Sequence, residues 1–348
     1  MCTKWHWWTK YLRLFMALFL IATLVSGCTS AKKEKPVITF YEGGWESQWL
    51  EIAIAQFIIE KGYDYPTESI MMSNEILFAA VEKGEVDVDI EEWPQNVPEW
   101  YNRMIDEGYY EEMGYILEGG PQFFCIPKWV AEQYNIKTVY DMKDHWELFK
   151  DPEDSSKGLF INSLISWGCT NINEIKLEAY GLSEYYNIIT PGSSGAWVAA
   201  MAGPQKKNQP VFGYYYSPTP LMGMYDWYIL EEPEHDPALW DKINAALDDP
   251  SLRPVDDACN YPDQPLPLCV HTNLREKAPD VVDMFDNMTI GLDRCSQTLA
   301  WVEENEVKNW EVGAVYFLRE FDSHWKTWVP NDVYQKIKKA VDDYGSIP

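Results

Sequence analysis

The segment that decides the fold is residues 37–61, with the sequence VITFYEGGWESQWLEIAIAQFIIEK. Its first five residues are apolar, β-branched or aromatic, which predicts a short buried strand. After the Gly43-Gly44 pair, apolar residues recur at helical spacing over 47–61. The sequence therefore predicts a strand that runs directly into a helix.

The same strand–helix unit recurs twice downstream. Residues 67–71 predict a strand before a helix at 74–83, and residues 86–90 predict a strand before a helix at about 98–107. Strands that alternate with helices are typical of an α/β protein with a parallel sheet, whose ligands bind outside the carboxyl ends of the strands. Gly62 and Gly84 stand where the first two helices are expected to end.

A second set of elements predicts a second α/β lobe, with strands at 122–126, 158–161, 210–216 and 227–230 and a helix at about 172–180. After a proline-rich stretch, a strand is expected at 268–272, followed by helices at 278–288, 292–305, 315–328 and 332–344. A chain of 348 residues usually divides into two domains.

The first 27 residues have the pattern of a secretory signal. Lys4, Lys10 and Arg13 form a basic region, and the apolar run at 14–25 contains no acid. That run is shorter than the roughly 20 residues that span a bilayer, which favours a cleaved signal peptide over a transmembrane anchor.

The junction at 24–28 resembles the lipobox of bacterial lipoproteins. The resemblance implies cleavage of residues 1–27 and lipid on the thiol of Cys28, with residues 28–35 as a tether. We therefore expect an exported protein, in the periplasm or at the cell surface, that is anchored to a membrane by this lipid.

The composition is strongly acidic, with 55 Asp and Glu against 28 Lys and Arg and a net charge of −27. Such a charge repels nucleic acid and anionic lipid, so we expect no nucleic-acid partner. A solvated surface and a cationic ligand both explain so many acids, and the charge alone does not choose between them.

The cysteines leave one pairing open. Five remain beyond Cys2 and Cys28, so at least one must be unpaired. Cys259 and Cys269 flank a proline-rich run at 261–267 and could staple that loop with a disulfide. No CxxC or HxxxH spacing is present, so we expect no metal and no cofactor.

Catalytic motifs are absent from the sequence. It contains no GxSxG, no HExxH and no GxxxxGK[ST], and its Gly-Gly pairs lack the dinucleotide pattern. Acid pairs such as Glu91-Glu92 carry little specificity in so acidic a chain. We therefore expect no enzyme. The remaining histidines suit exposed or capping roles: His145, His235, His271 and His324.

Aromatic residues are unusually abundant in this sequence, with 17 Trp, 22 Tyr and 13 Phe. Most of them must pack against other side chains in the core or on the surface. Four of them directly follow a predicted strand, where loops are placed by a scaffold yet are free to line a cleft. These four are Trp45, Trp93, Trp167 and Tyr216.

Several converging aromatic faces suit methylated ammonium ions, because each ring attracts a cation by roughly 0.5 to 2 kcal/mol without needing an N–H donor. Asn171 and Glu174 predict an N-cap and its N3 partner. Backbone N–H groups of Gly168 and Cys169 are then expected near a helix start, where a carboxylate is favoured. A cation cage beside such amides describes a site for a zwitterion.

These residues resemble the glycine betaine and quaternary-ammonium substrate-binding proteins of ABC importers. The resemblance covers most of the mature chain, including 38–63, 82–94, 126–136 and 211–218, and is most specific at Trp167-Gly168-Cys169. It implies a cage of Trp93, Trp167 and Tyr216, a carboxylate held by the amides of Gly168 and Cys169, and Trp45 as a wall known from the choline-binding branch.

The resemblance also implies a two-lobed periplasmic-binding-protein fold of type II, with the ligand cleft between lobes that two hinge crossings join. We expect lobe 1 at 36–123 plus 267–348 and lobe 2 at 124–266, with crossings near Phe123 and Leu266. The resemblance further implies that the protein is a monomer. Its implied partners are a permease and a small methylated-ammonium ligand. That ligand is glycine betaine or a related onium compound: choline, trimethylamine N-oxide or dimethylsulfoniopropionate.

Two departures from the family bear on the ligand. Glycine betaine members often carry a histidine soon after the first cage tryptophan, whereas this chain has Pro-Gln-Asn-Val at 94–97. The cysteine that pairs with the Cys169 position in some members is missing from 161–166, so we expect a free thiol. Acids are also expected around the cage mouth and favour a more cationic ligand: Glu42, Glu46, Asp89, Glu91 and Glu92.

Two other functions fit the same features. An exported carbohydrate-binding or carbohydrate-cleaving lipoprotein would also stack its ligand on tryptophan, but on a flat platform with polar rims. A receptor domain that feeds a sensor would need a downstream partner.

Overall fold

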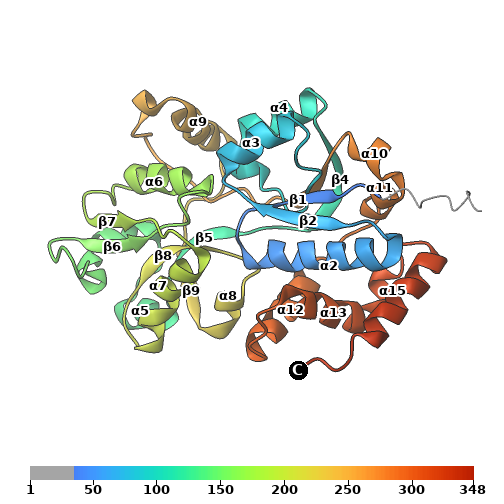
Figure 1. Ribbon diagram of the computed structural model, residues 1–348. Helices are drawn as coiled ribbons and strands as arrows, with labels where there is room; N and C mark the ends of the chain where they lie inside the picture. The colour runs from blue at the N-terminus through green and yellow to red at the C-terminus, as the bar shows by residue number, and fades with distance from the viewer. Residues whose placement is uncertain (1–34) are drawn as a thin grey trace, which may run out of the picture. The chain divides into compact units, whose positions relative to one another are not determined.

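The computed structural model describes residues 35–348. The signal peptide, Cys28 and most of the tether lie outside the described residues, so their predicted roles stay predictions. Among the described residues, no helix is long and apolar enough to cross a membrane. Two five-stranded sheets with helices packed against them form the α/β architecture in residues 36–348 (Figure 1).

The first sheet has the strand order β2-β1-β3-β10-β4. Its strands β1 and β2 are parallel, as are β1 and β3, while β10 is antiparallel to both β3 and β4. The strand bounds are β1 Ile38–Glu42, β2 Thr67–Met71, β3 Val88–Asp89, β4 Tyr110–Leu117 and β10 Leu266–His271.

The second sheet has the order β7-β6-β8-β5-β9. Strands β6, β7 and β8 are parallel, and β5 is antiparallel to β8 and β9. The bounds are β5 Gln122–Pro127, β6 Gly158–Ile161, β7 Tyr186–Ile189, β8 Phe212–Tyr216 and β9 Trp227–Ile229.

The expectation of parallel sheets is therefore wrong, because both sheets are mixed. The chain passes from the first sheet to the second between β4 and β5, and it returns between β9 and β10. Each arriving strand, β5 or β10, pairs antiparallel with its neighbours. The parallel strands are those joined by local strand–helix–strand connections, which the sequence pattern does predict.

The helices cover both sheets (Figure 1). Their bounds are α2 Glu46–Tyr63, α3 Asn74–Glu82, α4 Pro98–Asp106, α5 Lys128–Tyr134, α6 Cys169–Ala179, α7 Ser194–Lys206, α8 Pro220–Met224, α9 Pro237–Asp248, α10 Leu274–Lys277, α11 Pro279–Phe285, α12 Leu292–Glu304, α13 Trp310–Glu320, α14 Asp322–Trp325 and α15 Asn331–Asp343.

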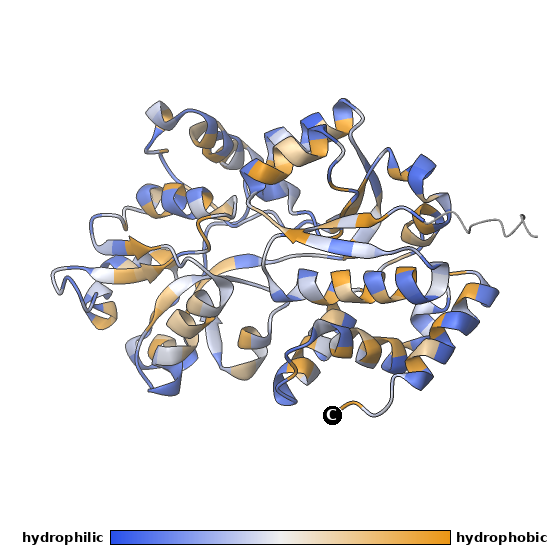
Figure 2. Ribbon diagram, in the orientation of Figure 1, coloured by the Kyte–Doolittle hydropathy of each residue, from blue (hydrophilic) through white to orange (hydrophobic). Residues whose placement is uncertain are grey.

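Helix α2 is the centre of the first lobe's packing. It contacts α12, α13 and α15, which lie side by side with it in Figure 1. Leu50, Ile54 and Ile58 of α2 are fully buried, and Figure 2 shows apolar and hydrophilic residues alternating along α13 and α15 as amphipathic helices require. Burying one such side chain stabilises the fold by about 1.5 to 3 kcal/mol.

Several helix predictions need correction. Gly62 does not end α2, which continues to Tyr63; a Cβ at Gly62 would lie 2.8 Å from Val333 of α15, so this glycine allows close helix packing. Gly84, with φ of +68°, does follow the end of α3. The helix expected at 315–328 is two helices, α13 and α14, because the backbone leaves helical geometry at Phe321.

The five cysteines of the described residues are all free and buried, so the disulfide considered between Cys259 and Cys269 is not formed. The proline-rich loop before β10 is held by other contacts. Tyr261, within that loop, is buried and donates its hydroxyl to Asn173 Oδ1 at 2.7 Å. This contact ties the loop to α6.

A fully buried ion pair holds α6 in the second lobe. Lys176 Nζ lies 2.8 Å from Glu232 Oε2, and both side chains are inaccessible to solvent. The ammonium group also lies over the rings of Phe124 and Tyr261, at 5.0 and 4.3 Å from their centroids. Since burying a charge is unfavourable unless it is paired, these contacts fix the position of the helix.

Replacing Lys176 by methionine should lower the free energy of unfolding by about 3 to 5 kcal/mol, because Glu232 is left as a buried charge without a partner. Urea denaturation followed by tryptophan fluorescence measures the change. The exposed pair Lys339–Asp343 provides the matched control, since Lys339→Met should leave stability nearly unchanged. Equal losses in the two variants would contradict this role of the buried pair.

Candidate functional site

The four aromatic residues singled out in the sequence lie at the carboxyl ends of parallel strands. Trp45 follows β1, Trp93 follows β3, Trp167 follows β6 and Tyr216 is the last residue of β8. The parallel pairs β1–β3 and β6–β8 each bring two of these ends to one edge of their sheet. The strand order of each sheet therefore places two of the four aromatic side chains at the same edge of that sheet.

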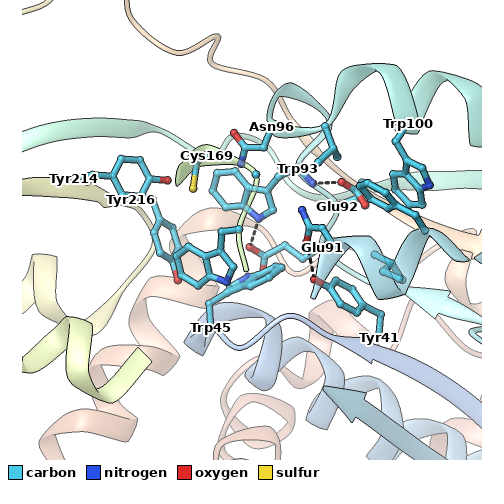
Figure 3. A pocket seen from close by; sticks show the side chains of 16 residues that line it. Tyr41, Trp45, Glu91, Glu92, Trp93, Asn96, Trp100, Cys169, Tyr214 and Tyr216 are labelled. Atoms are coloured by element: carbon cyan, nitrogen blue, oxygen red, sulfur yellow. Dashed lines mark hydrogen bonds between the residues drawn. The ribbon is translucent and has the colours of Figure 1, made fainter. Parts of the chain in front are cut away.

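The four rings meet as the walls of a box, and Figure 3 labels three of them, Trp45, Trp93 and Tyr216. The ring planes of Trp45 and Trp167 make an angle of 86°, with centroids 5.7 Å apart. Trp167 meets Tyr216 at 79° and 6.0 Å, and Tyr216 meets Trp93 at 86° and 5.5 Å. Because each contact is edge-to-face, the rings enclose a concave space instead of stacking flat.

Hydrogen bonds fix two of these rings. Trp167 donates its indole N–H to the carbonyl of Gly43 at 3.0 Å, which links the loop after β6 to the loop after β1. Trp93 donates its indole N–H to Glu91 Oε1 at 3.1 Å, shown by a dashed line in Figure 3. A Cβ on Gly43 would lie 1.9 Å from the ring of Trp45, so only glycine fits there.

A second layer of rings supports the box, and the sequence analysis missed it. Trp197 of α7 is fully buried, stacks on Tyr216 with an interplanar angle of 7° and meets Trp167 at 85°. It also stacks on Tyr215 at 4.1 Å. The run of aromatic residues at 214–216 was visible in the sequence, but no pattern placed a tryptophan from α7 against it.

Gly168 and Cys169 lie at the start of α6, which begins at Cys169, two residues before Asn171. The expected N-cap at Asn171 is therefore wrong, and Gly168 is the N-cap. The first N–H groups of a helix have no partner within the helix, so those of Gly168 and Cys169 can bind an anionic oxygen. The N–H of Thr170, the next residue, already donates to the Trp167 carbonyl at 3.2 Å. A Cβ on Gly168 would lie 2.4 Å from the carbonyl oxygen of Asn96, which explains the need for glycine here.

Cys169 is a buried thiol with no disulfide partner, as expected. Its Sγ lies 3.3 Å from Ser163 Oγ. Burial raises the pKa of this thiol to about 11, despite hydrogen bonds that lower it. The thiol therefore stays protonated at neutral pH and is not a nucleophile.

All six predicted ligand-binding residues line one pocket, with about 530 Å³ of atom-free space that is partly continuous with solvent. Its 16 lining residues include no Lys, Arg or His. The lining consists of the six predicted residues together with Tyr41, Asn74, Leu77, Phe78, Glu91, Glu92, Asn96, Val97, Trp100 and Tyr214.

The predicted ring of acids around the mouth is only partly right. Glu91 and Glu92 line the pocket, whereas the buried Asp89 and the half-buried Glu46 lie outside its lining. Glu42 points elsewhere, since it accepts hydrogen bonds from Trp49 and Ser69. Tyr41 and Glu42 are consecutive strand residues, so their side chains lie on opposite faces of the sheet and only Tyr41 reaches the pocket.

The acids beside the box have raised pKa values. Burial is the main cause for each, and raises the pKa of Glu91 to about 7, although Ser47 and Trp93 hydrogen-bond to it and lower the value. The pKa of Glu51 is raised well above its usual value by burial and by the charge of Glu91.

A second carboxyl pair behaves in the same way. Burial and the charge of Asp89 raise the pKa of Glu92, and burial raises the pKa of Asp89. Among the described residues, no group of three or more His, Cys, Asp or Glu side chains has the geometry to hold a metal ion. The pocket is therefore aromatic and acidic, with protonatable carboxyl groups in its wall.

The family model described as the substrate binding domain of ABC-type glycine betaine transport system matches residues 36–320. The glycine betaine/proline betaine-binding periplasmic protein of Escherichia coli (strain K12) is 31% identical over 117 residues. That match spans 32% of this chain and 34% of the relative, so the chain is matched to about a third of the relative's length.

Two solved structures share the fold. The glycine betaine/L-proline-binding protein of an ABC transporter from Borrelia burgdorferi has a TM-score of 0.68 at 19% identity, over 87% of this chain and 100% of that chain. An ABC-transporter choline binding protein in complex with choline has a TM-score of 0.68 at 16% identity, over 88% of this chain and 98% of that chain. At these identities the likeness is one of fold.

The raised pKa of Glu91 predicts how stability changes with pH. The folded protein binds more protons than the unfolded chain between the model-peptide value of 4.5 and about 7. Stability must therefore fall as pH rises through that window. We expect the free energy of unfolding to be larger at pH 5 than at pH 8, with Glu91 contributing on the order of 3 kcal/mol.

Urea denaturation at the two pH values measures this difference. The Glu91→Gln variant should show a smaller pH dependence, while Glu99→Gln, at an exposed position of α4, should keep the original one. An unchanged pH dependence in Glu91→Gln would contradict the assignment.

Proposed function

The chain belongs to the family of substrate-binding domains of ABC-type glycine betaine transport systems, and on this premise we propose that it binds a methylated onium compound in the box. Glycine betaine is the first candidate, with choline, trimethylamine N-oxide and dimethylsulfoniopropionate as related ligands. The box of Trp45, Trp93, Trp167 and Tyr216 is the observation that carries the proposal.

The chemistry of the box supports an onium ligand. A fully methylated ammonium group has no N–H to donate, so water or hydroxyl groups in its pocket cannot accept a hydrogen bond from it. Ring faces attract its diffuse charge, each by about 0.5 to 2 kcal/mol when desolvated. The lining offers two acids and no basic side chain, which also favours a cation.

The start of α6 supports a carboxylate at the other end of the ligand. Gly168 and Cys169 line the same pocket as the rings and lie where first-turn amides are unpaired. A ligand that places its ammonium group in the box could therefore direct a carboxylate to these amides. This arrangement suits glycine betaine in spite of the missing histidine after Trp93.

The box argues against the carbohydrate alternative. Sugars stack on one flat ring and need polar groups around it for their hydroxyls. Here neighbouring walls stand within about ten degrees of perpendicular, and Trp93 and Trp45 are almost completely buried. We therefore propose that the protein is a receptor that binds its ligand and catalyses no reaction.

The proposal includes movement of two lobes, 36–123 plus 267–348 and 124–266, about crossings near Phe123 and Leu266. A contact between the two lobes supports it, because Trp167, in the loop after β6, donates its indole N–H to the carbonyl of Gly43, in the loop after β1. A ligand that joins the walls would favour the closed arrangement, which an ABC permease could recognise. The proposed protein is an exported monomer with a lipid anchor at Cys28.

Trp93→Ala and Trp167→Ala should each abolish binding of the onium ligand without unfolding the protein, because each removes one wall. Isothermal titration calorimetry against glycine betaine, choline, trimethylamine N-oxide, dimethylsulfoniopropionate and a neutral sugar panel measures this. Trp310→Ala is the matched control, since Trp310 is half-buried beside Trp49 and outside the pocket. Binding retained in both wall variants would refute the site.

Gly168→Ala should weaken glycine betaine binding at least tenfold. The added Cβ would meet the carbonyl oxygen of Asn96 at 2.4 Å, so the start of α6 must move away from the loop after β3. Calorimetry measures the affinity, and Gly195→Ala in α7, where a Cβ meets open space, should leave it unchanged. Equal affinities in the two variants would show that the close approach at Gly168 is not needed.

A further inference from the structure

Glu91 connects the box to a second buried carboxyl group. Its Oε1 accepts hydrogen bonds from Trp93 Nε1 and from Ser47 Oγ, both at 3.1 Å. Glu51 of α2 interacts with it electrostatically, because the charge of Glu91 helps burial to raise the pKa of Glu51. Within the described residues, Glu91 Oε2 and both carboxyl oxygens of Glu51 are buried without a hydrogen-bond partner. Both carboxyl groups belong to residues that are fully buried, and Glu91 lines the pocket while Glu51 lies behind it.

Two buried carboxylates repel each other and are poorly solvated, so their neutral forms are favoured. Burial is the main cause that raises the pKa of both Glu51 and Glu91. Figure 3 shows the Glu91 carboxyl group beside the indole of Trp93, at the wall of the pocket. A charge on Glu91 would therefore lie next to a bound cation.

The groups facing this pair are acids or neutral donors. Cys295 of α12 faces both carboxyl groups, and Tyr216 of β8 faces Glu91 and Glu46. Asp89 and Glu92, the second pair, belong to the same segment as Glu91. Each of these two acids affects the pKa of the other. Lys, Arg and His are absent among the groups that act on Glu51 and Glu91 within the described residues. A cation in the box would thus be the nearest positive charge available to them.

We propose that the Glu51–Glu91 pair is the counter-charge of the aromatic box and that the site exchanges a proton of this pair for the onium cation. The proposal rests on the proposed function and adds its charge chemistry. In the step, the Glu91 carboxylic O–H bond breaks, the proton leaves to solvent, and the remaining carboxylate faces the ligand cation. Charge balances because one cation replaces another.

The direction of the pH effect follows from linkage. In the free protein, burial keeps Glu91 largely protonated below about pH 7. A cation in the box favours the carboxylate, so binding there releases a proton and becomes stronger as pH rises. Affinity should rise up to tenfold per pH unit below about pH 7 and level off above it. Glu51, whose pKa is raised well above its usual value by burial and by the charge of Glu91, stays neutral.

The probe for this exchange is tetramethylammonium, which carries a permanent charge, no carboxylate and no titratable group. Calorimetric titration of the mature protein at pH 6 in three buffers of different ionisation enthalpy counts the protons released. We expect a release that approaches one proton per bound cation at pH 6 and falls toward zero at pH 8. Binding without proton release at pH 6 would overturn the proposal.

Two variants assign the proton. Glu91→Gln should bind tetramethylammonium more weakly than the original protein at pH 8 and release no proton at either pH. Asp89→Asn, which removes the acid of the other pair that lies outside the pocket lining, should release protons as the original protein does. Proton release that persists in Glu91→Gln and disappears in Asp89→Asn would move the exchange to Asp89 and Glu92 and overturn the assignment. Thermal melting checks that both variants are folded, and the buffer series on the unchanged protein tests the exchange without any variant.

The experiment separates this inference from the proposed function. If no onium compound binds at any pH, the box itself is refuted. If tetramethylammonium binds with an affinity that Trp167→Ala abolishes but that does not change between pH 6 and pH 8, the box stands and the proton exchange is refuted.

Discussion

The hydrogen bond from the Trp167 indole to the Gly43 carbonyl is the contact on which the site depends. It joins the loop after β6 in one sheet to the loop after β1 in the other, and it sets Trp167 perpendicular to Trp45. Gly43 can accept this bond only because it lacks a Cβ, which would overlap the Trp45 ring. Two short loops thus determine where the walls from both sheets meet.

The same enclosure that forms the box explains the buried acids. Rings that exclude water lower the local dielectric, which strengthens the attraction of a cation to both the ring faces and Glu91. Without a cation, the same environment makes an ionised Glu91 unfavourable. The acid is therefore tolerated as a neutral group within hydrogen bonds from Ser47 and Trp93. An ionised Glu91 beside the box is therefore favourable only when a cation is bound next to it.

Local sequence patterns predicted the parts of the fold that local contacts determine. The strands at β2 and β6 and the helices α3, α4 and α12 have bounds close to those expected, because hydrophobic periodicity and neighbouring turns are local properties. Strand β10 inserts between β3 and β4 from almost 150 residues away, so no local pattern could reveal the antiparallel pairing. Strand β4 and helix α7 were missed altogether.

The candidate site was predictable where a residue follows a strand, because the end of a strand has a defined place in an α/β sheet. Trp45, Trp93, Trp167 and Tyr216 all lie at such ends and all line the pocket. Trp197 comes from a helix that the sequence did not reveal, and Glu42 was misplaced because neighbouring strand residues face opposite ways. The Glu51–Glu91 contact joins α2 to the loop after β3 and needs the tertiary fold.

Three of the four walls of the box come from loops and Tyr216 ends strand β8, whereas the support of the box comes from helices. Trp197 of α7 stacks on Tyr216 and meets Trp167, so two walls of the second lobe are fixed by one buried side chain. In the first lobe, Glu91 accepts from Ser47 of α2 and from Trp93, which ties a third wall to the helix that follows Trp45. Each lobe therefore holds its pair of rings rigid on its own. The proposed closure of the lobes would therefore need to adjust only the contacts between the pairs, which are those of Trp167 with Trp45 and the Gly43 carbonyl and that of Trp93 with Tyr216.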